Sequence, residues 1–251
     1  MRRLSLLLWL ALAAPALATE EPDRLFTEAS GHYDAGRFVE ASRLYDSLLR
    51  AGYKQPQVYF NLGNAQFRAG SLGQAIWAYR SAFNLAPRDV DIEANLTVAR
   101  LACRDKIEVA PPGLVKQVWR TASSVLSVAE GTLLVTWLWW SLWAVVAIAV
   151  FLPSVRSWTL PVIRLLALAW LVSASTLTVR YLAERNTQSG VVIAVETQAR
   201  SAPAPDEDVA FTGHAGMECL VRGQRGDYLL VELANGRVGW IPATDLKLVE
   251  S

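Results

Sequence analysis

Side chains that commonly carry out chemistry are scarce in this chain of 251 residues. It holds two histidines, His32 and His214, and two cysteines, Cys103 and Cys219, all well separated in the sequence. Metal binding and nucleophilic catalysis need such residues grouped at characteristic spacings, such as His-Glu-x-x-His or Cys-x-x-Cys, and neither spacing occurs. The sequence also has no glycine loop that would hold a phosphate and no serine in a nucleophile elbow. We therefore predict no catalytic residue, no metal site and no cofactor.

These scarce residues have simpler structural interpretations. Cys103 continues an apolar stripe at helical spacing, and Cys219 lies in a segment that alternates like a strand, so two isolated buried thiols are expected. A disulfide between them is the alternative, because exported proteins can form disulfides. The acidic run Ala204–Asp208 is expected to be a solvated loop rather than a metal site.

The composition argues against one class of partner and favours another. The formal net charge is +1, which gives no positive surface of the kind that binds nucleic acid. Hydrophobic residues make up 53% of the chain, unusually many for a soluble protein. They concentrate in three blocks, so membrane lipid is an expected partner and nucleic acid is not.

The first apolar block lies at the N-terminus. Two arginines precede an apolar run over residues 4–14, and Ala16-Leu17-Ala18 follows. This layout predicts a secretory signal peptide over residues 1–18, with cleavage after Ala18. An uncleaved N-terminal anchor is the alternative, and in both cases the region that follows is expected to be exported.

The other two apolar blocks are predicted to be membrane-spanning helices over residues 131–152 and 158–182. At 1.5 Å per residue, each reaches the roughly 30 Å of a bilayer's hydrocarbon core. Residues 153–157 are the only connection, so the two helices are expected to form a tight hairpin. Arg156 and Arg164 favour a cytoplasmic turn, and together with the signal peptide this places both hydrophilic regions outside the cytoplasm.

Four tryptophans fall within seven residues of the first predicted span: Trp137, Trp139, Trp140 and Trp143. The first three suit the interface between membrane and water, and Trp143 is expected to pack on the second span or on lipid. No potential ligand residues accompany them, so a cofactor role is not indicated.

An internal repeat is the clearest pattern in the N-terminal region. An offset of 34 residues aligns small, glycine and aromatic positions. The aligned pairs include Ala29 with Gly63, Gly36 with Gly70, Ala41 with Ala75, and Tyr45 with Tyr79. This pattern resembles the tetratricopeptide repeat. The resemblance implies a domain over residues 19–104, with helical hairpins over residues 22–55 and 56–89 and a capping helix over residues 90–104.

Gly63 needs an explanation, because glycine inside a helix costs roughly 0.5–1 kcal/mol relative to alanine. We predict that small residues lie where the two helices of each hairpin cross, so that Ala29 and Gly63 face Ala41 and Ala75. Gly36 and Gly70 are expected in left-handed caps just past the first helix of each hairpin.

The first helices of stacked repeats line a concave surface suited to a partner's helix or extended tail. The predicted groove residues are Phe26, Ser30, Tyr33, Phe60, Asn64, Phe67 and Arg68. The alternative, that Tyr33 and Phe67 only pack between helices, stays open. Phe26 and Asp91 occupy positions where the carboxylate-binding members of the repeat family have lysines, so capture of a chain terminus in this groove is not implied.

Residues 105–130 are predicted to link the repeats to the membrane. Pro111-Pro112-Gly113 breaks any helix there. The segment that follows has one apolar face, which predicts an amphipathic helix on the membrane surface, with a rigid spacer as the alternative.

The C-terminal region, residues 189–251, is predicted to hold five short strands separated by turn signals, including the hairpin signal Asn235-Gly236. The series resembles a bacterial SH3 domain, and Gly239-Trp240-Ile241-Pro242 is its most specific piece. The resemblance implies a small barrel with a binding surface that includes Tyr228, Trp240 and Pro242. Trp240 as simple barrel core is the alternative. Asp245 stands where the family has a groove tyrosine, so binding of proline motifs is not implied.

The order of these segments resembles the repeat-bearing branch of the Bat family, encoded in Bacteroides aerotolerance-type operons. The expected fold is a multidomain membrane protein with all-α tetratricopeptide-type hairpins, a two-helix transmembrane hairpin and a small all-β SH3-like barrel. The resemblance implies a two-pass bacterial inner-membrane protein with both soluble domains in the periplasm. It also implies partnership with von Willebrand A-domain Bat proteins and with a MoxR-type AAA+ ATPase that serves them.

Two functions follow as hypotheses. The first is a non-enzymatic scaffold that binds protein partners through the repeat groove. The second is a cell-envelope sensor or binder that recognises peptidoglycan or peptides through the SH3-like domain. An enzyme that uses Cys103 or Cys219 is the remaining, least favoured alternative.

Overall fold

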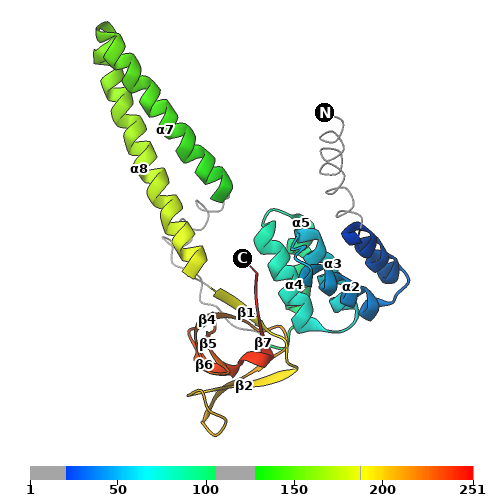
Figure 1. Ribbon diagram of the computed structural model, residues 1–251. Helices are drawn as coiled ribbons and strands as arrows, with labels where there is room; N and C mark the ends of the chain where they lie inside the picture. Colours follow the sequence, from blue (N-terminus) through cyan, green and yellow to red (C-terminus); the bar gives the residue numbers. More distant parts are fainter. Residues whose placement is uncertain (1–20, 106–127, 187, 251) are drawn as a thin grey trace, which may run out of the picture. The chain divides into compact units, whose positions relative to one another are not determined.

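The computed structural model describes residues 21–105, 128–186 and 188–250 (Figure 1). The chain divides into two compact units, one of which joins the N-terminal helices to the C-terminal strands, while the other holds the two long helices between them. The described residues thus combine helices with an antiparallel sheet. The predicted signal peptide and the predicted amphipathic helix lie outside the described residues.

The first unit begins with a run of antiparallel helices. A helix over residues 21–34 is followed by α2 (Phe38–Arg50), α3 (Pro56–Arg68), α4 (Leu72–Leu85) and α5 (Val90–Leu101). Gly36 and Gly70 have φ of 74° and 79°, so the predicted left-handed caps are confirmed. Asp89 caps α5, because its carboxylate accepts hydrogen bonds from the backbone N–H groups of Asp91 and Ile92.

Small residues let the helices of each hairpin approach closely. Ala29, Ala41 and Ala75 are completely buried, and Gly63 is also buried. A Cβ added at Gly63 would lie 2.6 Å from two ring carbons of Tyr79. The nearest partner of Gly63 is therefore the Tyr79 ring, one helical turn beyond the predicted Ala75. The small residue at this point admits an aromatic ring rather than a second small residue.

The second unit is a pair of long helices, α7 (Val128–Phe151) and α8 (Arg156–Asn186), joined by a short 3-10 turn, η1 (Pro153–Val155). Both helices are long and apolar enough to cross a membrane. Trp139 packs on Trp170 of α8 with ring centroids 5.2 Å apart, and Trp143 packs edge-on against Trp139. These rings contribute to the contact between α7 and α8.

The strands of the first unit form one antiparallel sheet in the order β3-β2-β6-β5-β4-β1-β7. Their bounds are β1 (Gln188–Val192), β2 (Glu196–Arg200), β3 (Val209–His214), β4 (Glu218–Arg225), β5 (Tyr228–Glu232), β6 (Val238–Pro242) and β7 (Leu246–Leu248). The hairpin signal is confirmed, since Gly236 has φ of 85° in the turn between β5 and β6. The hairpin of β2 and β3 was not among the five strands expected from the sequence.

Asp245 has a structural role at the start of β7. Its carboxylate accepts a hydrogen bond of 2.7 Å from the buried hydroxyl of Thr197, and its carbonyl accepts one of 2.8 Å from Ile193 N–H. These bonds tie the β7 end of the sheet to β2 and to the end of β1. Asp245 therefore stabilises this end of the sheet.

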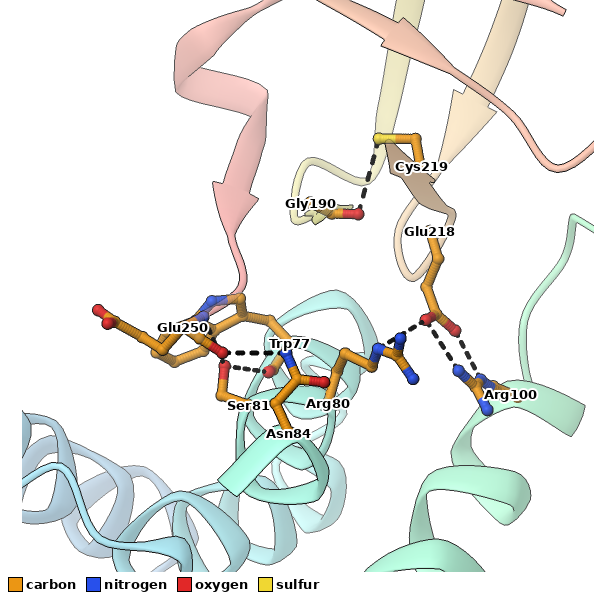
Figure 2. Close-up of polar contacts among 9 residues, drawn as sticks. All are labelled: Trp77, Arg80, Ser81, Asn84, Arg100, Gly190, Glu218, Cys219 and Glu250. Carbon is orange, nitrogen blue, oxygen red and sulfur yellow. Dashed lines mark hydrogen bonds and ion pairs between the residues drawn. The ribbon is translucent and has the colours of Figure 1, made fainter. Parts of the chain in front are cut away.

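The helices and the sheet of the first unit share a hydrophobic core. Val191 of β1 and Val249, just past β7, belong to the same buried cluster as Ile76 of α4. The approach is closest at Gly73, where an added Cβ would lie 2.5 Å from the carbonyl oxygen of Val192. Figure 2 shows the polar contacts across this junction. The helical repeat and the sheet are therefore one folded unit rather than two independent modules.

Candidate binding surfaces

The two helical hairpins have equivalent side-chain hydrogen bonds at positions 34 residues apart. Ser30 Oγ lies 2.9 Å from the hydroxyl of Tyr45, and one repeat later Tyr79 donates a hydrogen bond of 2.8 Å to Asn64 Oδ1. Phe26 packs on Tyr45 as Phe60 packs on Tyr79. The two hairpins therefore carry the same aromatic pair and the same polar contact at equivalent positions.

Both tyrosine hydroxyls remain neutral hydrogen-bonding groups at physiological pH. Burial raises the pKa of Tyr45 and that of Tyr79 above the ordinary value, and hydrogen bonds from Ser30 and Asn61 only partly offset this for Tyr45. Neutral hydroxyls can both donate and accept hydrogen bonds. This suits recognition of uncharged polar groups such as peptide amides.

A small pocket of about 150 Å³ opens between the helix over residues 21–34, α2 and α3. Its lining consists of hydrogen-bonding side chains: Ser30, Tyr33, Asp34, Tyr45, Asn61 and Asn64. Asn64 is held in place because its Oδ1 accepts from both Tyr79 and Asn95. Within the described part of the chain its NH₂ group has no acceptor, so these two donors are available to a ligand.

Only part of the predicted groove comes together at this pocket. Ser30, Tyr33 and Asn64 line it, whereas Phe26 and Phe60 pack on the buried tyrosines. The remaining predicted residues have other neighbours. Phe67 packs against the helical core, and Arg68 lies over the Phe38 ring at 4.7 Å. Tyr33 also packs edge-on against Phe38, so it both lines the pocket and supports the helices.

Asp34, Tyr45 and Asn61 line the pocket but were not among the predicted residues. The 34-residue offset marks two of these residues as repeated positions, and the first is Tyr45, the counterpart of Tyr79. Asn61 has its own counterpart in Asn95, and both residues are hydrogen-bonding amides of the second and third layers. A repeated polar residue inside an apolar pattern is therefore a useful sequence signal for such a pocket.

The predicted surface of the sheet is brought together by strand register. Tyr228 pairs with Pro242 and Leu230 pairs with Trp240 across β5 and β6, so these residues share one face. Leu229, Val231 and Ile241, between them, are buried in the core of the sheet. Tyr228, Trp240 and Pro242 are half-buried, and Trp240 lies outside that core. The surface interpretation of Trp240 therefore fits the strand register better than the core interpretation.

The junction between helices and sheet has its main charge contact at Glu218, the first residue of β4 (Figure 2). Arg100 of α5 donates two hydrogen bonds to its carboxylate, of 2.6 and 2.8 Å. Arg80 of α4 lies 3.8 Å away, and its Nε has no hydrogen-bond partner within the described residues. Burial lowers the pKa of Arg80, and the negative charge of Glu218 opposes this effect.

The end of the chain lies against α4 in the same junction (Figure 2). Trp77 Nε1 donates a hydrogen bond of 2.7 Å to the carbonyl of Leu248, and Asn84 donates one of 3.0 Å to the carbonyl of Glu250. The side chain of Glu250 accepts a hydrogen bond of 2.8 Å from Lys54. These contacts fix β7, an edge strand of the sheet, to the helices.

His214 and Asp105 make a further contact across the junction. The Asp105 carboxylate accepts a hydrogen bond of 2.7 Å from the His214 backbone N–H, and its other oxygen lies 2.8 Å from His214 Nδ1. This pair joins the end of β3 to the segment just after α5. His214 therefore has a structural role: it links two elements of the first unit.

The two cysteines are free thiols, as expected, but only Cys219 is buried, whereas Cys103 is half-buried. Burial raises the pKa of Cys103 to about 11 and that of Cys219 to about 12, and the charge of Glu218 adds to both effects. The thiolate is the reactive form of cysteine. Neither residue therefore has the lowered pKa of an activated nucleophile.

We expect iodoacetamide to modify both native cysteines slowly at pH 8. With a pKa of about 11, only about one thousandth of Cys103 is thiolate at that pH, whereas an unperturbed cysteine has roughly a quarter. The native rate should rise as the pH approaches 11, and the chain unfolded in guanidinium should react about 100-fold faster at pH 8. Mass spectrometry of each cysteine peptide measures this. Rapid native labelling at pH 8 would contradict the buried thiols.

No group of three or more His, Cys, Asp or Glu side chains that could hold a metal ion occurs within residues 21–105, 128–186 and 188–250. Neither a scan against protein-family models nor a search of curated proteins gave a match to this chain.

Proposed function

We propose that this chain is a non-enzymatic, membrane-tethered scaffold that binds a protein partner at the pocket between its helical hairpins. On this proposal the hairpins are tetratricopeptide repeats, the sheet is an SH3-like domain, and α7 and α8 anchor both at the periplasmic face of a bacterial inner membrane. The partner belongs to a Bat-type complex with von Willebrand A-domain proteins, served by a MoxR-type ATPase.

The observation that carries the proposal is the pocket of Ser30, Tyr33, Asp34, Tyr45, Asn61 and Asn64. Its amide and hydroxyl groups can both donate and accept hydrogen bonds, as a peptide backbone requires. The oriented NH₂ group of Asn64 supplies donors, and the neutral hydroxyl of Tyr45 can take part in both kinds of bond. The volume, about 150 Å³, is below that of pockets that enclose a drug-sized ligand, so the pocket would hold only a small part of a partner.

The test is co-purification of partners with the full chain, solubilised in detergent from the membranes of its own cells. Replacing Asn61 and Asn64 together by alanine should reduce recovery of the specific partner at least about tenfold, because a tenfold loss corresponds to about 1.4 kcal/mol and a central contact residue costs about 2 kcal/mol or more when it is truncated. Gln57→Ala is the matched control, since Gln57 is an exposed amide on the same helix outside the pocket.

Equal recovery of partners by the double variant and by the control would refute this use of the pocket. The proposed periplasmic location of the helical hairpins is tested separately, by a fusion of alkaline phosphatase after Arg88. The enzyme needs export to become active, so an inactive fusion would refute the periplasmic location without bearing on the pocket.

A second candidate function is recognition of the cell envelope by the sheet. Tyr228, Trp240 and Pro242 form one half-buried face of β5 and β6, and aromatic rings of this kind often contact sugars or peptides. Retention of the full chain on purified peptidoglycan, lost on Trp240→Ala but kept on Val238→Ala, would favour this function. Equal retention of the two variants would count against it.

A further inference from the structure

A second cavity, of about 390 Å³, lies between α2, α3, α4 and β7. It shares no lining residue with the pocket proposed above. Its charged and aromatic lining residues are Arg43, Asp46, Arg50, Trp77 and Lys247. Lys247 comes from the sheet and the others come from the helices, so both parts of the unit contribute to the lining of the cavity.

The lining carries three cations and one carboxylate. Asp46 is already engaged, because it pairs with Arg50 and lies 4.0 Å from Lys247 Nζ. Arg43 has no acidic partner among the residues that the structure describes. The lining therefore has a net excess of two positive charges, and the charge of Glu250, outside the lining, also acts on Lys247.

Lys247 is the partly buried cation of this lining, so an anion that binds beside it is expected to be stabilised strongly. Its ammonium lies 3.3 Å from the centre of the Trp77 ring, and burial lowers the pKa of Lys247 below the usual value. The nearby Asp46 only partly opposes this effect. A charge removed from water is stabilised by an opposite charge more strongly than an exposed one. A second carboxylate near Lys247 would therefore stabilise its ammonium charge further than Asp46 does.

We propose that this cavity binds an acidic peptide segment, with a carboxylate side chain between Arg43 and Lys247 and the rest of the segment against Trp77. Gln66 and Gln74 also line the cavity, and their amides match the donors and acceptors of a peptide backbone. The volume is at the lower end of pockets that enclose organic ligands and exceeds the needs of one inorganic anion. The site is independent of the proposed scaffold function, since different residues form it.

The test is isothermal titration calorimetry of the full chain in detergent with three probes. These are the capped dipeptide acetyl-Glu-Glu-amide, its uncharged analogue acetyl-Gln-Gln-amide, and inorganic phosphate. The glutamate peptide should bind at least about tenfold more tightly than the glutamine peptide, because hydrogen bonds to charged groups are the stronger kind. The difference should shrink at high salt, since salt screens these partly exposed charges.

Arg43→Gln removes the unpaired cation and should abolish most of the preference for the glutamate peptide. Arg43 is exposed and has no ion pair with any residue in the described parts of the chain, so this variant is expected to fold. Lys247→Met should have the same effect, with the folded state checked by circular dichroism. Arg24→Gln is the matched control, because Arg24 is an exposed arginine outside the cavity.

Three results would overturn the proposal. One is equal affinity for the glutamate and glutamine peptides, and a second is equal affinity of Arg43→Gln and Arg24→Gln for the glutamate peptide. The third is phosphate binding as tight as that of the glutamate peptide, which would assign the cavity to inorganic anions. The Asn61→Ala, Asn64→Ala double variant should bind the peptide normally here, so failure of this site and failure of the scaffold pocket can be distinguished.

Discussion

Replacing Gly73 by alanine is expected to separate the helical repeat from the sheet. The new methyl carbon would lie 2.5 Å from the carbonyl oxygen of Val192 and 3.0 Å from the Cα of Ile193. Both are backbone atoms of the sheet, so no side chain can rotate away to make room. We expect a loss of about 3 kcal/mol in the free energy of unfolding of this unit, at the upper end of the range for overpacked cores.

Amide hydrogen exchange of the full chain in detergent measures this loss locally. A change of about 3 kcal/mol corresponds to exchange on the order of 100-fold faster in α4 and β1. Gly31→Ala is the matched control, because Gly31 lies in the helix over residues 21–34 with no atom within 4 Å of an added Cβ. That change should stabilise by roughly 0.5–1 kcal/mol. Unchanged exchange in Gly73→Ala would refute the tight junction.

The repeat offset explains how much of this fold the sequence predicts. Residues 34 apart have the same local role, so the paired glycines Gly36 and Gly70 both adopt the left-handed conformation expected of them. The periodicity also predicts helices, because it reports which face of each helix is apolar. It does not report which atoms of two helices lie closest to each other, so the close approach of the Tyr79 ring to Gly63 was not predicted.

The sequence analysis did not predict the junction with the sheet, because the α4 residues that form it differ from their counterparts in α2. Val39 in α2 is 49% exposed, whereas its counterpart Gly73 is buried against the sheet. Ser42 is likewise replaced by the completely buried Ile76, and Arg43 by Trp77. A face that becomes smaller or more apolar in the second repeat indicates that something covers it there. The sequence contains that signal but does not say that the sheet is the covering element.

At the candidate pocket too, positions set by the local helix pattern were predicted, whereas contacts between distant segments were not. Ser30 and Asn64 follow from their places on the first helices of the hairpins, and both line the pocket. The hairpin of β2 and β3 has few β-branched residues and a long polar connection, so local pattern did not reveal it. Contacts such as that between His214 and Asp105 join residues 109 apart and depend on the packing of whole elements.

Replacing Glu218 by glutamine is expected to loosen the same junction through charge rather than volume. Arg100 would lose two charge-assisted hydrogen bonds, and the half-buried Arg80, whose Nε is buried, would lose the carboxylate charge 3.8 Å away. Breaking a fully buried pair costs about 3–5 kcal/mol. The Arg100 side chain is 42% exposed, so water will recover part of that loss, and we expect about 2 kcal/mol.

The measurement is again hydrogen exchange, with about 30-fold faster exchange expected in α5 and at the start of β4. Glu232→Gln is the matched control, since Glu232 pairs with Arg222 at 2.6 Å within the sheet and at the surface, where such a pair contributes about 1 kcal/mol or less. Arg100→Gln added to Glu218→Gln should cost little more, because the two residues share one interaction. Full additivity of the two changes would mean that the carboxylate of Glu218 does not hold α5 to the sheet. The burial of Arg80 would then need another source of stabilisation within the unit.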